Sequence, residues 1–315
     1  MSKSIIWFDQ PAKEWNEALP IGNGRLGAMV YGQTSMEQIQ LNEESVWYGG
    51  PRDRNNPDAL GNISKIRELL LNGKPKEAEK LAMMALSGIP ETQRHYMGLG
   101  ELFLDFDHND VSDYKRELDL ENGIVSVEYN CGGVKFHREI FSSYPSNLIV
   151  IRLTASQSAS ITFSARLTRD QSRLMEEVRA ARGNSLVMRG NCGGIGGSDF
   201  RVVLSANFKG GSLQTIGEHL LVNDADEVTL FLAADTTFHH NDPESACFHA
   251  VDKVKQMNYD RLKSIHITDY RELYSRVSLN LFDHSSGQNE QLPADQRLKR
   301  LKEGYEDNGL LALYF

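Results

Sequence analysis

Ala28-Met29-Val30-Tyr31-Gly32-Gln33-Thr34-Ser35, followed two residues later by Gln38-Ile39-Gln40-Leu41, is the stretch that decides the fold class. A short apolar run leads into small and polar residues that suit a turn. Polar and apolar residues then alternate, as they do in a strand with one buried face. The stretch therefore predicts a β-hairpin near the start of the chain.

Strand-like segments continue from about residue 100 to 235 with no helical pattern between them, which predicts a β-sandwich or barrel. The clearest are 101–106, 124–129, 147–153 and 228–232. Helical spacing occurs at 59–87, where Gly73-Lys74-Pro75 divides two helices, and again at 247–277, 293–302 and 309–315. We expect a mainly β fold, with a β-sandwich domain at 1–242 and a helical linker at 243–315.

The last helical segment begins at Asn308 and contains Leu310, Leu311, Leu313, Tyr314 and Phe315, without a capping residue after them. An apolar helix usually continues until neighbours cover its apolar face. The pattern therefore predicts that this segment leads into a further domain.

Composition excludes some classes of partner. The formal net charge of −9 counts against binding to nucleic acid or to an anionic membrane. No stretch approaches the roughly 20 apolar residues of a membrane-spanning helix, and the first seven residues lack a signal-peptide core. These features indicate a soluble protein and slightly favour the cytoplasm, although a leader removed from the protein would look the same. Three cysteines indicate buried or free thiols.

Three other patterns have features of cofactor or metal sites. Gly22-Asn-Gly-Arg-Leu-Gly27 matches the dinucleotide fingerprint, but a strand-like run follows it where that fingerprint needs a helix, so we expect a tight turn. Asn191-Cys-Gly-Gly-Ile-Gly-Gly-Ser198 lacks the lysine of a phosphate loop and indicates a hairpin loop. His239 and His240 lie near Asp235 and could bind a metal or relay protons, yet neighbours on a strand face opposite ways. A structural role is the better interpretation, and we expect no cofactor and no metal.

The segment Asn42-Glu43-Glu44-Ser45-Val46-Trp47-Tyr48-Gly49-Gly50-Pro51 combines two carboxylates with two aromatic rings. Such rings can cover the apolar face of a sugar while carboxylates accept its hydroxyl protons. Trp47 and Tyr48 could equally fill the core or a domain interface. The sequence leaves both interpretations open, and nothing in the spacing of its carboxylates selects a catalytic pair.

Two long motifs resemble the opening of glycoside hydrolase family 95 proteins: Trp15-Asn-Glu-Ala-Leu-Pro-Ile-Gly-Asn-Gly-Arg-Leu-Gly-Ala-Met-Val-Tyr-Gly32 and Leu41-Asn-Glu-Glu-Ser-Val-Trp-Tyr-Gly-Gly-Pro51. The resemblance continues in order through 99–106, 114–120, 137–142, 225–230 and 266–270. It implies a large β-sandwich, a helical linker and an (α/α)6 barrel, with inverting hydrolysis of terminal α-1,2-linked L-fucose.

The resemblance also implies that the catalytic groups lie in the barrel, which would begin shortly after Phe315, so no catalytic residue is assigned to this span. Inverting enzymes hold two catalytic groups about 6.5–9.5 Å apart, which a sandwich alone cannot supply. We expect an accessory domain that orients the barrel, with Asn42, Glu43 and Trp47 near the substrate or the barrel. A fucosylated oligosaccharide and the chain's own barrel are the expected partners. The alternatives are a free-standing carbohydrate-binding or structural module, and an enzyme selective for a related sugar such as L-galactose.

Overall fold

The structure is a computed structural model that describes residues 4–169, 175–278 and 289–313. Two compact units make up the chain. The sandwich unit comprises 1–46, 98–191 and 199–315, and the helical unit comprises 47–97 and 192–198. Among the described residues, no helix is both long and apolar enough to span a membrane.

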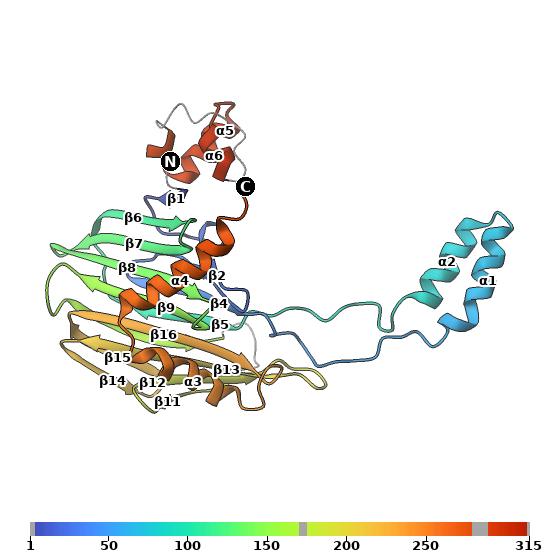
Figure 1. Ribbon diagram of the computed structural model, residues 1–315, viewed down its shortest axis with the longest axis horizontal. Coiled ribbons are helices and arrows are strands. Elements are labelled where there is room, and N and C mark those ends of the chain that lie inside the picture. Colours follow the sequence, from blue (N-terminus) through green and yellow to red (C-terminus); the bar gives the residue numbers. More distant parts are fainter. Residues whose placement is uncertain (1–3, 170–174, 279–288, 314–315) are drawn as a thin grey trace. The chain divides into compact units, whose positions relative to one another are not determined.

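The strands of the sandwich unit pair antiparallel in two sheets (Figure 1). The nine-stranded sheet has the order β1-β6-β7-β8-β9-β16-β13-β12-β11, and the seven-stranded sheet has the order β14-β15-β10-β5-β4-β3-β2. In the first sheet the bounds are β1 Ile5–Phe8, β6 Val111–Asp119, β7 Ile124–Cys131, β8 Val134–Ser143, β9 Leu148–Ala155, β16 Glu227–Thr236, β13 Asp199–Lys209, β12 Ser185–Asn191 and β11 Met175–Ala181. In the second they are β14 Ser212–Ile216, β15 His219–Ala225, β10 Ile161–Thr168, β5 Gly100–Asp105, β4 Met36–Glu43, β3 Leu26–Val30 and β2 Leu19–Gly22. The predicted β-sandwich is confirmed.

The hairpin predicted from residues 28–41 is β3 and β4, which pair antiparallel with Ala28 opposite Leu41. Alternate residues of β4 are buried, so Ile39 and Leu41 lie in the core while Gln38 and Gln40 are only partly covered. The glycine motif at 22–27 forms the turn between β2 and β3, where Gly24 adopts a φ of 90° that favours glycine. A strand follows the motif, so the dinucleotide interpretation is correctly rejected.

A buried ion pair lies among these apolar residues. Arg138 on β8 donates to the Glu37 carboxylate at 2.6 Å and to the Tyr129 hydroxyl at 2.7 Å, and all three side chains are buried. Glu37 also accepts from the backbone N–H of Gly32. Since β4 and β8 belong to different sheets, this pair connects the two layers of the sandwich.

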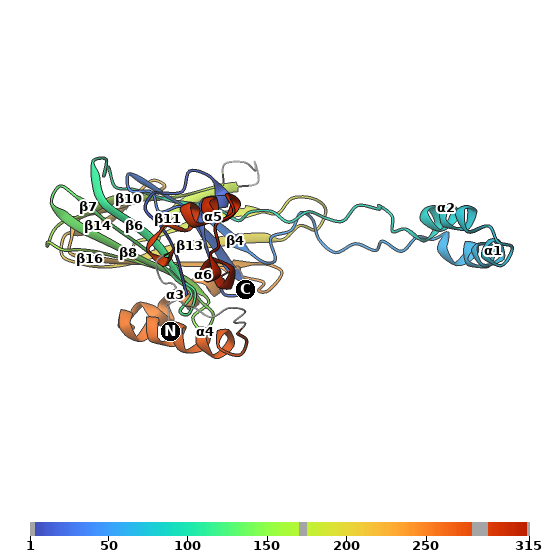
Figure 2. The same cartoon turned by 90° about the horizontal axis from the view of Figure 1, so that it is seen from above.

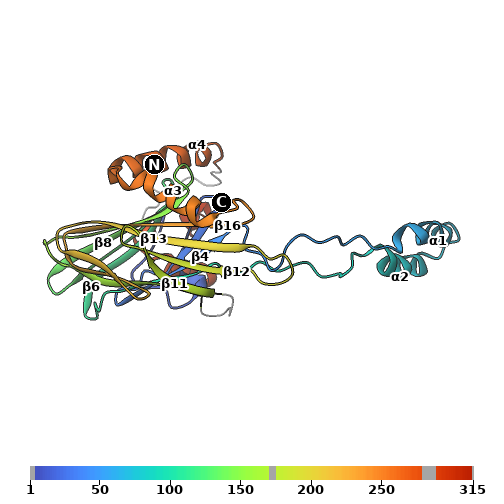
Figure 3. The ribbon, with the colours of Figure 1, turned by 90° about the horizontal axis from the view of Figure 1, so that it is seen from below.

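Two helices cover the outer face of the nine-stranded sheet. They are α3 (Pro243–Lys255) and α4 (Tyr259–Tyr274), and they lie on the same side of the sandwich (Figures 2 and 3). Asp242 caps α3 by accepting from the N–H of Ser245, and Asn258 caps α4 by accepting from the N–H of Asp260. The helical stretch predicted at 247–277 thus begins earlier and is broken at residues 256–258. Apolar residues on one face of α3 pack against the sheet: Cys247, Phe248, Val251 and Val254.

Two shorter helices, α5 (Ala294–Lys302) and α6 (Asn308–Leu313), follow. Arg297 and Asp307 form a buried, bidentate ion pair that joins them at 2.7 and 2.8 Å. Tyr314 and Phe315, which contributed to the predicted apolar run, lie outside the described residues.

The helical unit is built on α1 (Ala59–Leu71) and α2 (Pro75–Leu86), as the sequence predicted. Gly73 adopts a left-handed φ of 69° just after α1, and Pro75 opens α2 at a position where its missing N–H costs nothing. The loop at 192–198 also belongs to this unit and joins β12 to β13, which confirms the predicted hairpin loop.

Candidate functional site

A polar cluster lies where β4 and β16 end, and Glu43 is its buried carboxylate. Glu43 is the last residue of β4 and takes the same inward face as Ile39 and Leu41, so its side chain is 0% exposed. Its Oε2 accepts from both the backbone N–H and the hydroxyl of Ser45, at 2.8 and 2.6 Å. These bonds shape the backbone that leaves the strand.

Arg25 reaches the same cluster from the turn between β2 and β3. The Asn23 side-chain oxygen accepts from the N–H groups of Arg25 and Leu26, which holds this turn closed. The Arg25 guanidinium lies 3.5 Å from Glu43 Oε1 and 3.5 Å from Asp235 Oδ2. The partly exposed guanidinium of Arg25 thus compensates the charge of two buried carboxylates, which would otherwise repel each other.

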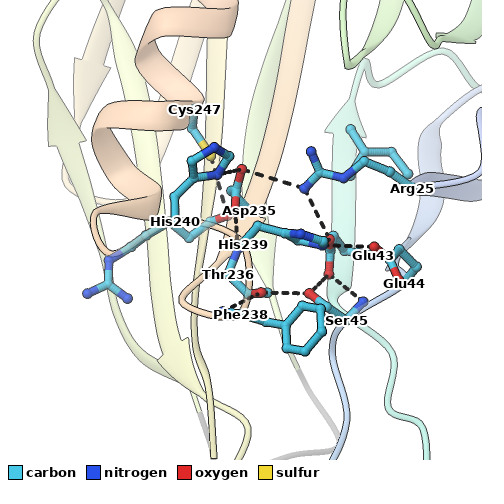
Figure 4. A network of polar contacts seen from close by, with 12 residues as sticks. Arg25, Glu43, Glu44, Ser45, Asp235, Thr236, Phe238, His239, His240 and Cys247 are labelled. Atoms are coloured by element: carbon cyan, nitrogen blue, oxygen red, sulfur yellow. Dashed lines mark hydrogen bonds and ion pairs between the residues drawn. The ribbon is translucent and has the colours of Figure 1, made fainter.

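The end of β16 supplies the other half of the cluster (Figure 4). His239 and His240 follow the strand in a turn whose backbone N–H groups donate to the carbonyl of Thr236. His239 Nε2 lies 2.8 Å from Glu44, whereas His240 Nδ1 lies 2.9 Å from Asp235. The two imidazoles contact different carboxylates, as expected for neighbours that share no ligand site, yet both belong to one network through Arg25.

The cluster also joins the two sheets and has an exposed side. Ser45 follows β4 and Thr236 ends β16, and their hydroxyls lie 2.6 Å apart. Phe238 is 68% exposed and its ring meets the His239 ring edge-on at 5.1 Å. Three exposed side chains therefore lie on the solvent side of the buried carboxylates that Arg25 pairs with. Glu44 offers an acceptor, His240 an imidazole ring and Phe238 an apolar face.

A divalent cation is one possible occupant of this cluster. Ligand atoms of Glu43, Glu44 and His239 all lie within 4.8 Å of one another, and carboxylates with imidazole are donors that zinc and manganese accept. Arg25 already places a positive charge 3.5 Å from Glu43, which disfavours a second cation there. The arrangement suits hydrogen bonding to neutral hydroxyl groups better than metal binding.

Cys247 lies beside the cluster but is a poor nucleophile. Burial raises the pKa of its thiol well above the usual range, and the nearby Asp235 carboxylate adds to that rise. Its Sγ lies 3.7 Å from the backbone carbonyl of Arg201. All three cysteines are free among the described residues, as the sequence indicated.

The structure gives the three residues that the sequence nominated different surroundings. Glu43 lies in the cluster, and Asn42 precedes it on the opposite face of β4, across from Gly27. Trp47 belongs to the helical unit, where its ring meets the Tyr96 ring edge-on at 5.4 Å. Trp47 is 44% exposed and Tyr48 is 39% exposed, so the suggestion that they fill the core is wrong.

Sequence reasoning missed Arg25 as a site residue and did not connect it with Asp235. The available signal was a charged side chain, Arg25, inside a glycine-rich turn. Asp235 was noticed only as a neighbour of the histidines. The 210 positions between Arg25 and Asp235 left no local pattern that could join them.

The chain is similar to known glycosyl hydrolases. Residues 6–241 match the family described as "Glycosyl hydrolase family 65, N-terminal domain". Residues 258–315 match "Glycosyl hydrolase family 95 catalytic domain", a match that begins inside the stretch predicted as a linker.

Curated relatives extend this similarity over nearly the whole chain. "Alpha-L-fucosidase 2" of Arabidopsis thaliana is 31% identical over 98% of this chain, and "Probable alpha-fucosidase A" of Aspergillus niger is 28% identical over 96%. The chain spans 40% of the length of each. A solved structure, "Putative kojibiose phosphorylase from human microbiome", shares the fold with a TM-score of 0.51 and 10% identity, covering 92% of this chain and 41% of that one. The chain therefore belongs to the family described as "Glycosyl hydrolase family 65, N-terminal domain", and its last segment, 258–315, is similar to the family 95 catalytic domain.

Proposed function

We propose that this chain is the N-terminal part of an α-L-fucosidase that removes terminal α-1,2-linked L-fucose from glycans with inversion. The observation that carries the proposal is 31% identity to "Alpha-L-fucosidase 2" over 98% of the chain. That similarity includes both the family 65-type domain and the segment matched to the family 95 catalytic domain. In this proposal the sandwich supports and orients the catalytic domain and supplies no catalytic residue of its own.

The packing of α4 supports this division of labour. The helix lies within the segment matched to the catalytic domain, and it rests on the nine-stranded sheet through Leu262 and His266. His266 Nε2 donates to the backbone carbonyl of Asn122 at 2.9 Å, and its ring stacks on Phe141 at 4.6 Å. A buried contact of this kind positions the helix on the sheet rather than merely tethering it.

The polar cluster supports a role close to a glycan. Its exposed Glu44 offers an acceptor and its exposed Phe238 offers an aromatic face. The ion pair between Arg25 and Glu43 lies beneath them. Sugars are recognised by such pairs of polar groups and aromatic surfaces, because each pyranose has hydroxyls at its edge and C–H groups on its faces. We place the cluster at the surface that the fucosylated oligosaccharide or the catalytic domain contacts. Trp47, in the helical unit, is a separate candidate for such a contact.

The first experiment compares this chain with a longer form that continues through a complete family 95 catalytic domain. Release of L-fucose from 2′-fucosyllactose is measured for both, with 3-fucosyllactose as the linkage control. We expect release from the 2′-linked substrate by the longer form only, with the β-anomer appearing first in NMR spectra because the reaction inverts. Release by the 315-residue chain itself would show that catalytic groups lie within it.

A second experiment addresses the cluster. In the longer form, Glu44→Gln keeps the size of the side chain and removes its charge, and Glu68→Gln on α1 is a matched control. We expect Glu44→Gln to raise KM for 2′-fucosyllactose about fivefold, because a hydrogen bond to a charged group contributes about 1.5–3 kcal/mol and one between neutral groups, which Gln can still make, about 0.5–1.5 kcal/mol. Equal kinetics for the two variants would remove the cluster from the proposed binding surface.

A further inference from the structure

A cavity of about 560 Å³ lies at the other end of β16 from the polar cluster. It is bounded by the outer face of the nine-stranded sheet and by the connection between α3 and α4. The cluster begins at Asp235, whereas the cavity touches β16 at Glu227, Thr229 and Phe231, so its nearest lining residue lies roughly 13 Å away along the strand at about 3.3 Å per residue. Its volume falls within the range of about 300–1,000 Å³ that is usual for small-molecule sites.

The floor of the cavity is a row of three polar residues on neighbouring strands. Arg152 on β9, Thr229 on β16 and Asn207 on β13 are direct cross-strand partners. The next residues along this face, Val150 on β9 and Phe231 on β16, are also partners and belong to the apolar core beneath α3 and α4. The outer face of the nine-stranded sheet therefore changes from apolar to polar beside the connection between α3 and α4.

Thr229 is the most informative member of this row. It is only 6% exposed and it lines the cavity. Val would satisfy the β-propensity of this position with no polar group to desolvate. A buried threonine beside a cavity is consistent with a hydroxyl that hydrogen-bonds to a ligand.

The charged side chains around the cavity are held in place by partners within the fold. Arg152 pairs with Glu227 at 2.9 Å, and its guanidinium stacks on the Tyr259 ring at 4.2 Å. Lys255 donates to the carbonyl of Gly183 at 2.9 Å and to the hydroxyl of Ser205 at 3.0 Å. Groups that are already ordered lose little conformational entropy when a ligand arrives.

The lining is close to electrically balanced. Arg152, Lys209 and Lys255 contribute positive charge, whereas Glu227 and Asp260 contribute negative charge. Lys209 and Arg152 both contact the same Glu227 oxygen, and Lys255 donates to a carbonyl and a hydroxyl, so each cation already has a hydrogen-bond or ion-pair partner and three positive side chains face two negative ones. The surface offers both donors and acceptors without a large net charge, and the side chains of Met257 and Leu262 add apolar area.

We propose that this cavity binds a neutral polyhydroxylated ligand of one or two sugar rings, at a site separate from the polar cluster. Alternating donors and acceptors match the hydroxyls of a sugar, and the apolar wall matches its C–H faces. The proposal does not depend on fucosidase activity, because the cavity lies wholly within the sandwich unit.

The test uses the 315-residue chain with lactose and maltose, which are neutral and lack fucose, and measures binding by isothermal titration calorimetry. Glucose 6-phosphate and inorganic phosphate serve as anionic probes. We expect a neutral disaccharide to bind at millimolar concentration and phosphate not to bind. Thr229→Val, which removes the hydroxyl and keeps the shape, should weaken sugar binding about fivefold. Thr215→Val on β14 of the other sheet should leave it unchanged.

Hydrogen exchange on the unmodified chain locates the ligand independently of any variant. Lactose should protect amides in 205–209, 227–231 and 255–260. Absence of disaccharide binding, tighter binding of phosphate, or protection confined to residues 235–240 would each overturn the proposal. The last outcome would assign sugar binding to the polar cluster and so leave the proposed function intact.

Discussion

His239 Nε2 lies 2.8 Å from the Glu44 carboxylate, although the two residues are 195 positions apart in the sequence. One follows β16 of the nine-stranded sheet and the other follows β4 of the seven-stranded sheet. The contact therefore depends on how the two sheets are stacked. It lies in the same network as Arg25, whose removal gives the first prediction.

Replacing Arg25 with Met should destabilise the sandwich by about 2–4 kcal/mol. The substitution leaves the buried carboxylates of Glu43 and Asp235 without their cation, and breaking a fully buried pair costs about 3–5 kcal/mol. We expect somewhat less here because Arg25 is partly exposed and its contacts are 3.5 Å long. Urea unfolding gives the free energy. Arg276→Met, which removes an exposed pair with Glu272, should change it by no more than about 0.5 kcal/mol.

Removing Arg138 from its ion pair with Glu37 should destabilise the protein more than removing both residues. Arg138→Met leaves Glu37 buried and uncompensated, and we expect a loss of about 3–5 kcal/mol. Replacing both residues with Met should cost less than Arg138→Met alone, because no charge then stays buried. A double-mutant cycle measured by chemical unfolding checks this. A double variant less stable than either single one would contradict the prediction.

His266 should make stability fall as the solution becomes acidic. Burial lowers the pKa of its imidazole below the usual value, so the folded state favours the neutral ring. The unfolded chain then binds the proton more readily, and stability is lost as pH falls from about 6.5 towards the folded pKa. His266→Gln should reduce the slope of unfolding free energy against pH in this range by up to about 1.4 kcal/mol per unit.

The control for that experiment is His219→Gln, at an exposed position on β15. Unfolding free energies of the two variants and the unmodified chain are compared between pH 5 and 8. If His219→Gln changes the slope as much as His266→Gln does, the pH dependence does not come from the contact between α4 and the sheet.

Trp47→Ala should weaken substrate binding or lower the melting temperature in the longer form of the enzyme. The ring is 44% exposed and contacts Tyr96, so it has surface available for a sugar or for the catalytic domain. Tryptophan is enriched among the interface residues whose truncation costs more than about 1 kcal/mol, and a loss of about 1 kcal/mol corresponds to about fivefold in KM. Trp15→Ala removes another exposed tryptophan as the control. Unchanged kinetics and an unchanged melting temperature for Trp47→Ala would exclude both roles.

Elements with strong local signals were predictable. The hairpin of β3 and β4 follows from a turn between two apolar runs, and the division of α1 from α2 follows from Gly73 and Pro75. The rejection of a dinucleotide site at 22–27 was also local, because a strand followed the glycines. In each case neighbouring residues in the sequence carry the whole physical reason.

The candidate site was only partly predictable. The sequence singled out Glu43 because it lies in a motif with two aromatic residues, but it did not reveal that the carboxylate is buried or paired with Arg25. It grouped Glu43 with Trp47, which the structure places in another unit. The cavity at Thr229 left no trace in the sequence, because its floor comes from three strands that are distant along the chain.

By itself the sequence determined the class of fold, the order of strands and helices, and the family, since these depend on periodicity, turn residues and recognisable motifs. Only the tertiary structure decided which strands became neighbours and in what register. That choice brought Arg25, Glu43 and Asp235 together and set Arg152 beside Thr229. The physical reason is that side chains alternate across a strand, so long-range pairing and sheet packing, rather than local sequence, select which polar groups meet.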